Sequence, residues 1–113
     1  MQGSKYARLS GTNRLTSRQV IVILDCLHAP VNHSMFEVFN QRNVLDNALS
    51  KLSSSVFKRE GMKYAHFGPG NRMTRIQAQR LIWFVDRIMP TYKRFNPQIH
   101  RVLGNALRKL KTA

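Results

Sequence analysis

The sequence predicts an α+β, mostly helical fold made of two tandem copies of one unit, with a pseudo-twofold relation between the copies. Each unit is expected to be a β-hairpin followed by two or three helices. The first observation is an internal repeat at an offset of 58 residues, with 15 identities among the 53 ungapped pairs of residues 3–55 and 61–113. Average residue usage would give only about 5–7% identity by accident. We therefore expect repeat units at 3–55 and 61–113, joined at 56–60 by the end of a long helix.

The second observation is a cluster of turn-forming residues near the start of each copy. Lys5–Leu15 contains Ser10-Gly11-Thr12-Asn13 at its centre, and Lys63–Met73 contains Gly68-Pro69-Gly70-Asn71. Gly, Pro and Asn supply the backbone dihedrals of tight turns, so both segments are predicted to be β-hairpins.

The third observation is a matching helix start after each hairpin. Thr16 precedes Gln19 by three residues and Thr74 precedes Gln77 by three, which is the spacing of a capping box. Apolar residues then recur with helical periodicity, at Val20, Ile23, Leu24 and Leu27 and at Ala78, Leu81, Ile82 and Val85. Pro30 and Pro90 are expected to end these two helices.

The remainder of each copy is predicted to be helical. In the first copy, Ser34 and Glu37 indicate a short helix over about 35–39, and a longer helix is expected from Val44 to about Arg59. In the second copy, Asn96-Pro97 is typical of an N-cap followed by the first helical residue. This copy lacks the Ser34/Glu37 start, which leaves open whether its short and long helices merge.

The charge of the chain indicates a polyanionic partner. There are 19 basic and 5 acidic residues, for a formal charge of +14, and residues 61–113 contain eleven of the basic residues and one of the acidic ones. Such self-repulsion does not favour folding, so nucleic acid is the expected partner. No stretch has the length of a membrane span, and a lone Cys26 cannot form an internal disulfide. We expect a cytoplasmic, nucleoid-associated protein that does not bind membranes.

Catalytic and metal-binding classes are not supported by the sequence. Cys26, His28 and His33 are close together, but three possible ligands with no fourth partner do not make a structural zinc site. Five scattered acids do not suggest a metal-dependent nuclease, and no phosphate-binding loop or hydrolase motif occurs. We expect no enzyme activity, no metal and no cofactor.

The order of predicted elements from 15 to 74 resembles the winged helix-turn-helix family. The resemblance rests on Leu15-Thr16-Ser17-Arg18-Gln19, on Asn47-Ala48-Leu49-Ser50-Lys51-Leu52, on Gly61 and on Lys63–Thr74. It implies that the helix containing Asn47 enters the major groove and that residues 63–74 form the wing. The turn lacks the family's usual glycine, and no wing follows the second copy. Either the hairpin at 3–15 folds across to serve as that wing, or the four strands form one sheet.

Twelve residues are predicted to contact nucleic acid. Asn47 and Lys51 lie one helical turn apart off the buried stripe and recur as Asn105 and Lys109, which suggests contacts to base edges or phosphates. Arg14 and Arg72 also recur, next to the hairpins, and suggest phosphate contacts. The full predicted set is Lys5, Arg14, Asn43, Asn47, Ser50, Lys51, Lys63, Arg72, Arg101, Asn105, Arg108 and Lys109.

Together these features predict a sequence-specific protein for double-stranded DNA that acts by occupying its site. A transcriptional or replication regulator of phage or mobile-element type is the expected role, as a monomer with pseudo-twofold symmetry or as a homodimer. Two alternatives remain open: an RNA- or ribosome-binding basic protein, and an inhibitor whose basic face binds an acidic protein.

Overall fold

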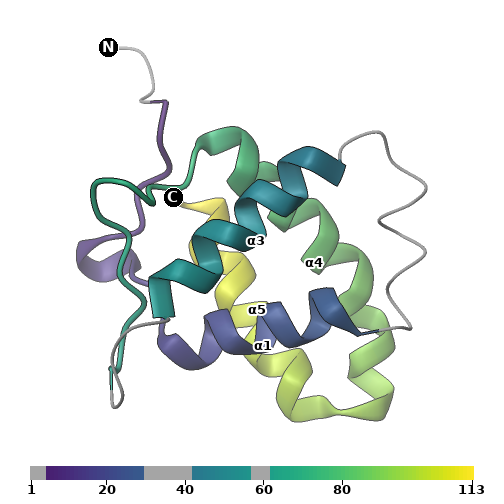
Figure 1. Ribbon diagram of the computed structural model, residues 1–113. Coiled ribbons are helices and arrows are strands. Elements are labelled where there is room, and N and C mark those ends of the chain that lie inside the picture. The colour runs from purple at the N-terminus through teal and green to yellow at the C-terminus, as the bar shows by residue number, and fades with distance from the viewer. Residues whose placement is uncertain (1–4, 30–41, 57–61) are drawn as a thin grey trace.

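A computed structural model describes residues 5–29, 42–56 and 62–113. For Arg42 and Asn43 it describes the backbone alone. In this part of the chain the regular elements are one short 3-10 turn and four α-helices (Figure 1). They are η1 (Gly11–Asn13), α1 (Ser17–His28), α3 (Arg42–Val56), α4 (Arg75–Phe95) and α5 (Pro97–Lys111). The segments that precede α1 and α4 are irregular and lie side by side at one edge of the helices (Figure 1). We call residues 5–15 the first arm and residues 62–73 the second arm.

Three predicted helix starts are confirmed. The Thr16 hydroxyl accepts from the Gln19 amide at 3.0 Å, and the Gln19 side chain accepts from the Thr16 amide at 2.8 Å. Thr74 and Gln77 form the same capping box at the start of α4, at 3.1 and 2.9 Å. Asn96 accepts from the Ile99 amide at 3.2 Å, with Pro97 as the first residue of α5.

The apolar stripes of the helices meet in one core. α1 and α4 each pack against both α3 and α5, so each contacts a helix of its own copy and a helix of the other copy. The buried stripe residues are Val20, Ile23 and Leu27 in α1, Leu45, Ala48 and Leu52 in α3, Ala78, Leu81, Phe84, Val85 and Ile88 in α4, and Leu103, Ala106, Leu107 and Leu110 in α5. The arms add Leu9, Leu15, Ala65 and Met73 to this core.

The predicted β-hairpins are wrong, and with them the α+β class and the winged-helix arrangement. The described residues form only two isolated antiparallel bridges, Tyr6 with Thr74 and Thr16 with Tyr64. Each bridge joins an arm to the helix start of the other copy, so the backbone groups that would pair within a hairpin are used across the molecule. The turn residues do reverse the chain, but the Asn13 side chain then donates to the Arg8 carbonyl oxygen at 3.0 Å in place of a strand ladder. The described part of the chain is all-helical.

The predicted end of a helix at Pro90 is also wrong, because α4 continues through Pro90 to Phe95. A proline removes the hydrogen bond to the carbonyl group four residues earlier, here that of Asp86. Pro90 and Asp86 are both exposed, so water can hydrogen-bond to this carbonyl oxygen. Ile88 is buried and Tyr92 packs on the core, which keeps the helix in place on both sides of the proline. The short helix predicted near 35–39 lies outside the described residues.

Candidate nucleic-acid interface

The two arms are exchanged between the repeat copies. The backbone hydrogen bonds between each arm and the helix start of the other copy form two pairs related by 58 residues. They are Ala7 N to Met73 O (2.9 Å) and Ala65 N to Leu15 O (2.9 Å), and Arg75 N to Lys5 O (3.0 Å) and Ser17 N to Lys63 O (2.9 Å). The first arm therefore lies along the start of α4, and the second arm lies along the start of α1. Each helix start is completed by backbone from the other half of the chain.

This exchange brings a tyrosine of each arm under an arginine of the other. The Arg14 guanidinium carbon lies 4.2 Å from the centre of the Tyr64 ring, and that of Arg72 lies 4.1 Å from the Tyr6 ring. A lysine of the tyrosine's own arm completes each group, with Lys63 Nζ 5.4 Å from the Tyr64 ring and Lys5 Nζ 5.8 Å from the Tyr6 ring. We call Arg14, Lys63 and Tyr64 the Tyr64 cluster, and Lys5, Tyr6 and Arg72 the Tyr6 cluster.

The two clusters hold cations on the surface in a defined orientation. Arg14, Arg72, Lys5 and Lys63 are exposed, whereas Tyr6 and Tyr64 are half-buried. A guanidinium group stacked on an aromatic face keeps its N–H donors in its own plane, where they can bind a phosphate in a bidentate manner. Among the described residues, neither arginine guanidinium makes a hydrogen bond. Four of the twelve residues predicted from the sequence are thus brought together in two equivalent pairs.

Lys51 and Lys109 occupy equivalent positions beneath these clusters. Lys109 Nζ donates to the Arg14 carbonyl oxygen at 2.6 Å and to Gln19 Oε1 at 3.1 Å. Lys51 Nζ donates to the Arg72 carbonyl oxygen at 2.5 Å and to Gln77 Oε1 at 3.4 Å. Both ammonium groups therefore bind the backbone that carries the stacked arginine. These intramolecular hydrogen bonds explain why a lysine occurs at both positions of the repeat, without a contact to nucleic acid.

The other predicted contact residues lie on α3 and α5. Asn47 and Ser50 are exposed on α3, and Arg101 and Arg108 are exposed on α5. Asn105 is not equivalent to Asn47 in its contacts, because its side-chain oxygen accepts from Arg108 at 3.1 Å. The Asn43 side chain lies outside the described residues.

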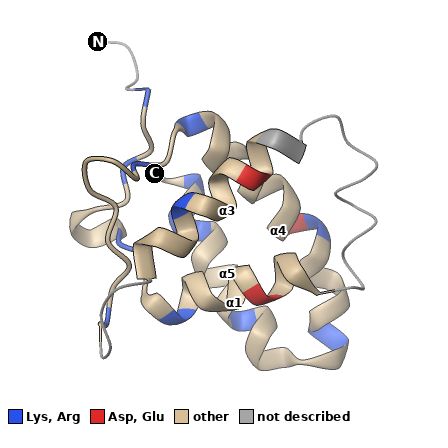
Figure 2. Ribbon diagram, in the orientation of Figure 1, with Lys and Arg blue, Asp and Glu red and all other residues tan. Residues whose placement is uncertain are grey.

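The acidic residues of the described chain are kept away from the arms. Asp25, Asp46 and Asp86 lie on α1, α3 and α4, while the two arms contain five Lys or Arg residues and no acid (Figure 2). The electrostatic potential around the arms is therefore positive, because no acidic side chain of either arm offsets the basic ones.

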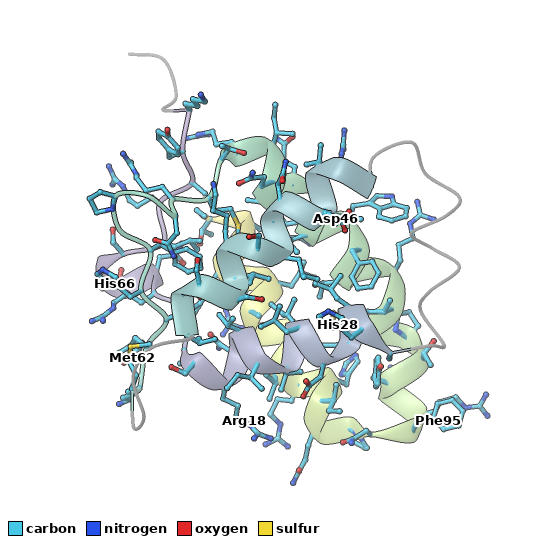
Figure 3. All side chains as sticks on the ribbon, viewed as in Figure 1. Arg18, His28, Asp46, Met62, His66 and Phe95 are labelled. Atoms are coloured by element: carbon cyan, nitrogen blue, oxygen red, sulfur yellow. The ribbon has the colours of Figure 1, made fainter. Side chains whose placement is uncertain are left out.

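The sequence reading missed one cavity beside the Tyr64 cluster. It has a volume of about 390 Å³ and is lined by Arg14, Ser54, Ser55, Met62, Lys63, Tyr64 and His66. His66 and Met62 both belong to the second arm (Figure 3). One sequence pattern could have pointed to His66, because it is the repeat counterpart of the basic residue Arg8. The α3 serines that complete the cavity could not be placed beside the arm from sequence spacing.

The remaining reactive groups do not form a second site. Cys26 is buried, and this burial raises the pKa of its thiol even though a hydrogen bond to the Tyr92 side chain acts in the opposite direction. Within the described ranges, no three His, Cys, Asp or Glu side chains are close enough together to hold a metal ion. No helix in this part of the chain has the length and apolarity needed to cross a membrane.

Comparison of the chain with protein-family models, with curated proteins and with solved structures finds no match.

Proposed function

We propose that this chain binds double-stranded DNA through its phosphate backbone and acts by occupying the duplex, without catalysis. The observation that carries the proposal is the pair of exposed Arg–Tyr–Lys clusters on a chain of formal charge +14. The role that follows is regulation of transcription or replication by occupancy.

Each cluster places two like charges against one aromatic ring, and a bound anion would explain this arrangement. Arg14 and Lys63 share the Tyr64 ring, as Arg72 and Lys5 share the Tyr6 ring. An exposed cation–π contact contributes only about 0.5–1 kcal/mol, and the repulsion between the two cations opposes it. A phosphate bound between them would remove that repulsion and release counterions from the DNA.

The exposure of the tyrosines favours a duplex backbone over a single strand. Proteins that bind single-stranded nucleic acid stack bases on open aromatic faces. Here a guanidinium group covers one face of Tyr6 and of Tyr64, and both side chains are half-buried. The cluster therefore offers arginine donors to a phosphate more readily than a ring to a base.

The test is a salt titration of binding to a 20-base-pair duplex, by fluorescence anisotropy, for the native chain and for the double variant Arg14→Gln/Arg72→Gln. Each lost phosphate contact lowers the slope of log K against log salt by about 0.9, so the double variant should lose about two units of slope. Arg87→Gln is the matched control, because Arg87 also stacks on an aromatic ring, that of Trp83, at 4.7 Å but lies outside the arms.

A double variant that keeps the native slope would overturn the proposal. Stronger competition by stem-loop RNA than by duplex DNA at equal salt would point to RNA instead. Binding to neither nucleic acid at low salt would point to an acidic protein as the partner.

A further inference from the structure

The cavity beside the Tyr64 cluster is built where the second arm meets the last turn of α3. The His66 amide donates to the Ser55 carbonyl oxygen at 2.8 Å, which ties the arm to the helix. Asn71 extends this link, because its side-chain nitrogen donates both to Ser54 Oγ at 3.1 Å and to the His66 carbonyl oxygen at 3.1 Å. The walls are therefore held by hydrogen bonds within the described chain.

We propose that this cavity binds a single phosphate group. Arg14 and Lys63 supply two cations at its edge, and His66 and Ser54 supply further hydrogen-bonding groups in the lining. All four side chains carry donors suited to phosphate oxygens. The inference deepens the proposed function, since it rests on that function for the source of the phosphate, a nucleic acid.

The charge balance in the cavity favours an anion. Ser54 and Ser55, both from α3, add no ionised group to the lining. Arg14 and Lys63 contribute two full positive charges at the same edge. None of the residues that line the cavity is acidic, so its charge attracts an oxyanion.

The two serines have different roles. Ser55 is buried and its hydroxyl donates to the Leu52 carbonyl oxygen at 2.6 Å, so it forms the cavity wall. Ser54 is exposed and its hydroxyl donates to the Lys51 carbonyl oxygen at 3.1 Å. When a phosphate binds, this O–H can turn from the Lys51 carbonyl oxygen and donate to a phosphate oxygen instead.

The equivalent position in the other half of the repeat has a different composition. Thr112 stands in place of Ser54, Ala113 in place of Ser55 and Arg8 in place of His66. The Thr112 hydroxyl donates to Asn13 Oδ1 at 2.9 Å, which links it to the first arm. The counterpart site shares Arg72 with the Tyr6 cluster, so the matched control is Arg87→Gln, which lies outside both clusters and outside the cavity lining.

The first experiment is an NMR titration of the full-length chain with inorganic phosphate at constant ionic strength, using chloride as the balancing salt. We expect saturable shifts of the His66 ring and Ser54 amide signals. Arg14→Gln should weaken phosphate binding by about tenfold, the effect of losing one charge-assisted hydrogen bond. Arg87→Gln, which removes a stacked arginine outside the arms and outside the cavity lining, should leave the affinity for phosphate unchanged. Shifts that do not saturate, or equal weakening by the two variants, would overturn the inference.

The second experiment identifies the source of the phosphate. A 5′-phosphorylated duplex is compared with the same duplex lacking that phosphate. Tighter binding of the phosphorylated duplex, lost in Arg14→Gln, would identify a terminal phosphate as the ligand. Equal binding of the two duplexes, with inorganic phosphate displacing both, would identify an internal phosphodiester. Duplex binding that inorganic phosphate does not displace would overturn the inference and leave the proposed function standing. Phosphate binding without duplex binding would overturn the function instead.

Discussion

The ammonium group of Lys109 lies 2.6 Å from the carbonyl oxygen of Arg14, so the C-terminal part of α5 is hydrogen-bonded to the residue that presents its guanidinium to Tyr64. Lys51 makes the same contact with Arg72 in the other half. Because each lysine also binds the glutamine of a capping box, it joins a helix of one copy to the helix start of the other. These lysines position the clusters.

Lys109→Met is expected to destabilise the fold by about 1–2 kcal/mol, since the Arg14 carbonyl and the Gln19 side chain lose a charged donor. Lys109 is half-buried, which lowers the expected cost below that of a fully buried partner. Urea unfolding followed by circular dichroism measures the change. Lys111→Met, at an exposed position of the same helix, is the control and should change stability by less than about 0.5 kcal/mol. Equal losses for the two variants would show that the Lys109 contacts do not contribute.

Tyr64→Leu should weaken duplex binding by about twofold to fivefold, because a cation–π contact of about 0.5–1 kcal/mol no longer orients the Arg14 guanidinium. Tyr64→Phe keeps the aromatic face and should bind the duplex as the native chain does. Anisotropy at one fixed salt concentration compares the three chains. Equal weakening by Leu and Phe would show that the hydroxyl, and not the stacked ring, matters for binding.

Asn47→Ala tests base reading by α3, which stays a prediction. An asparagine that pairs with adenine contributes about 1–3 kcal/mol of discrimination, so the variant should prefer its selected site less strongly over a site with one changed base pair. Competition binding with selected and mutated duplexes measures this difference. An unchanged preference in Asn47→Ala would mean that the exposed Asn47 side chain does not read bases.

Cleavage of the chain within residues 57–61 should leave the two halves associated. α1 packs on α5 and α4 packs on α3, and the arms are exchanged between the halves. A protease site introduced in this segment and cut after folding gives two fragments, which size-exclusion chromatography should find together in buffer and apart in urea. Separation in buffer would contradict the exchanged arrangement.

Burial raises the pKa of the Cys26 thiol above its ordinary 9.0, and this predicts a dependence of stability on pH. The folded state favours the protonated thiol, so the contribution is fully present below pH 9.0 and is lost as the pH rises through the folded-state pKa. Cys26→Ala removes this titration. The difference in unfolding free energy between the native chain and Cys26→Ala, measured by urea titration, should therefore shrink from pH 8 to pH 10. A constant difference over that range would contradict the prediction.

Sequence patterns predicted correctly those features whose hydrogen bonds join residues close together in the chain. The Thr16 and Thr74 capping boxes and the Asn96-Pro97 helix start are confirmed, because their hydrogen bonds join residues three apart. The helix expected to start at Val44 is found as α3, at Arg42–Val56, and its expected end near Arg59 lies outside the described residues. The predicted helix end at Pro90 is wrong because tertiary packing on both sides of a proline can keep a helix intact, and the local sequence does not show that packing.

The candidate site divides in the same way. Lys5, Lys63, Arg14 and Arg72 were identified from composition and recurrence, but no spacing rule pairs Arg14 with Tyr64 across 50 residues of chain. His66 and Ser54 were missed for the same reason, since only the contact between the second arm and α3 brings them to one cavity.

The repeat of 58 residues, the positive charge, the helix starts and the apolar faces follow from the sequence, because each depends on residue type and on neighbours within a few positions. The pairing of each arm with the other copy follows from tertiary contacts. The Ala7 amide and the Leu15 carbonyl oxygen could satisfy their hydrogen bonds within a hairpin or across the molecule, and a backbone donor or acceptor has no sequence identity that distinguishes the two partners. Burial of the arm residues Leu9, Leu15, Ala65 and Met73 among the four helices favours the exchanged arrangement, and with it the two clusters.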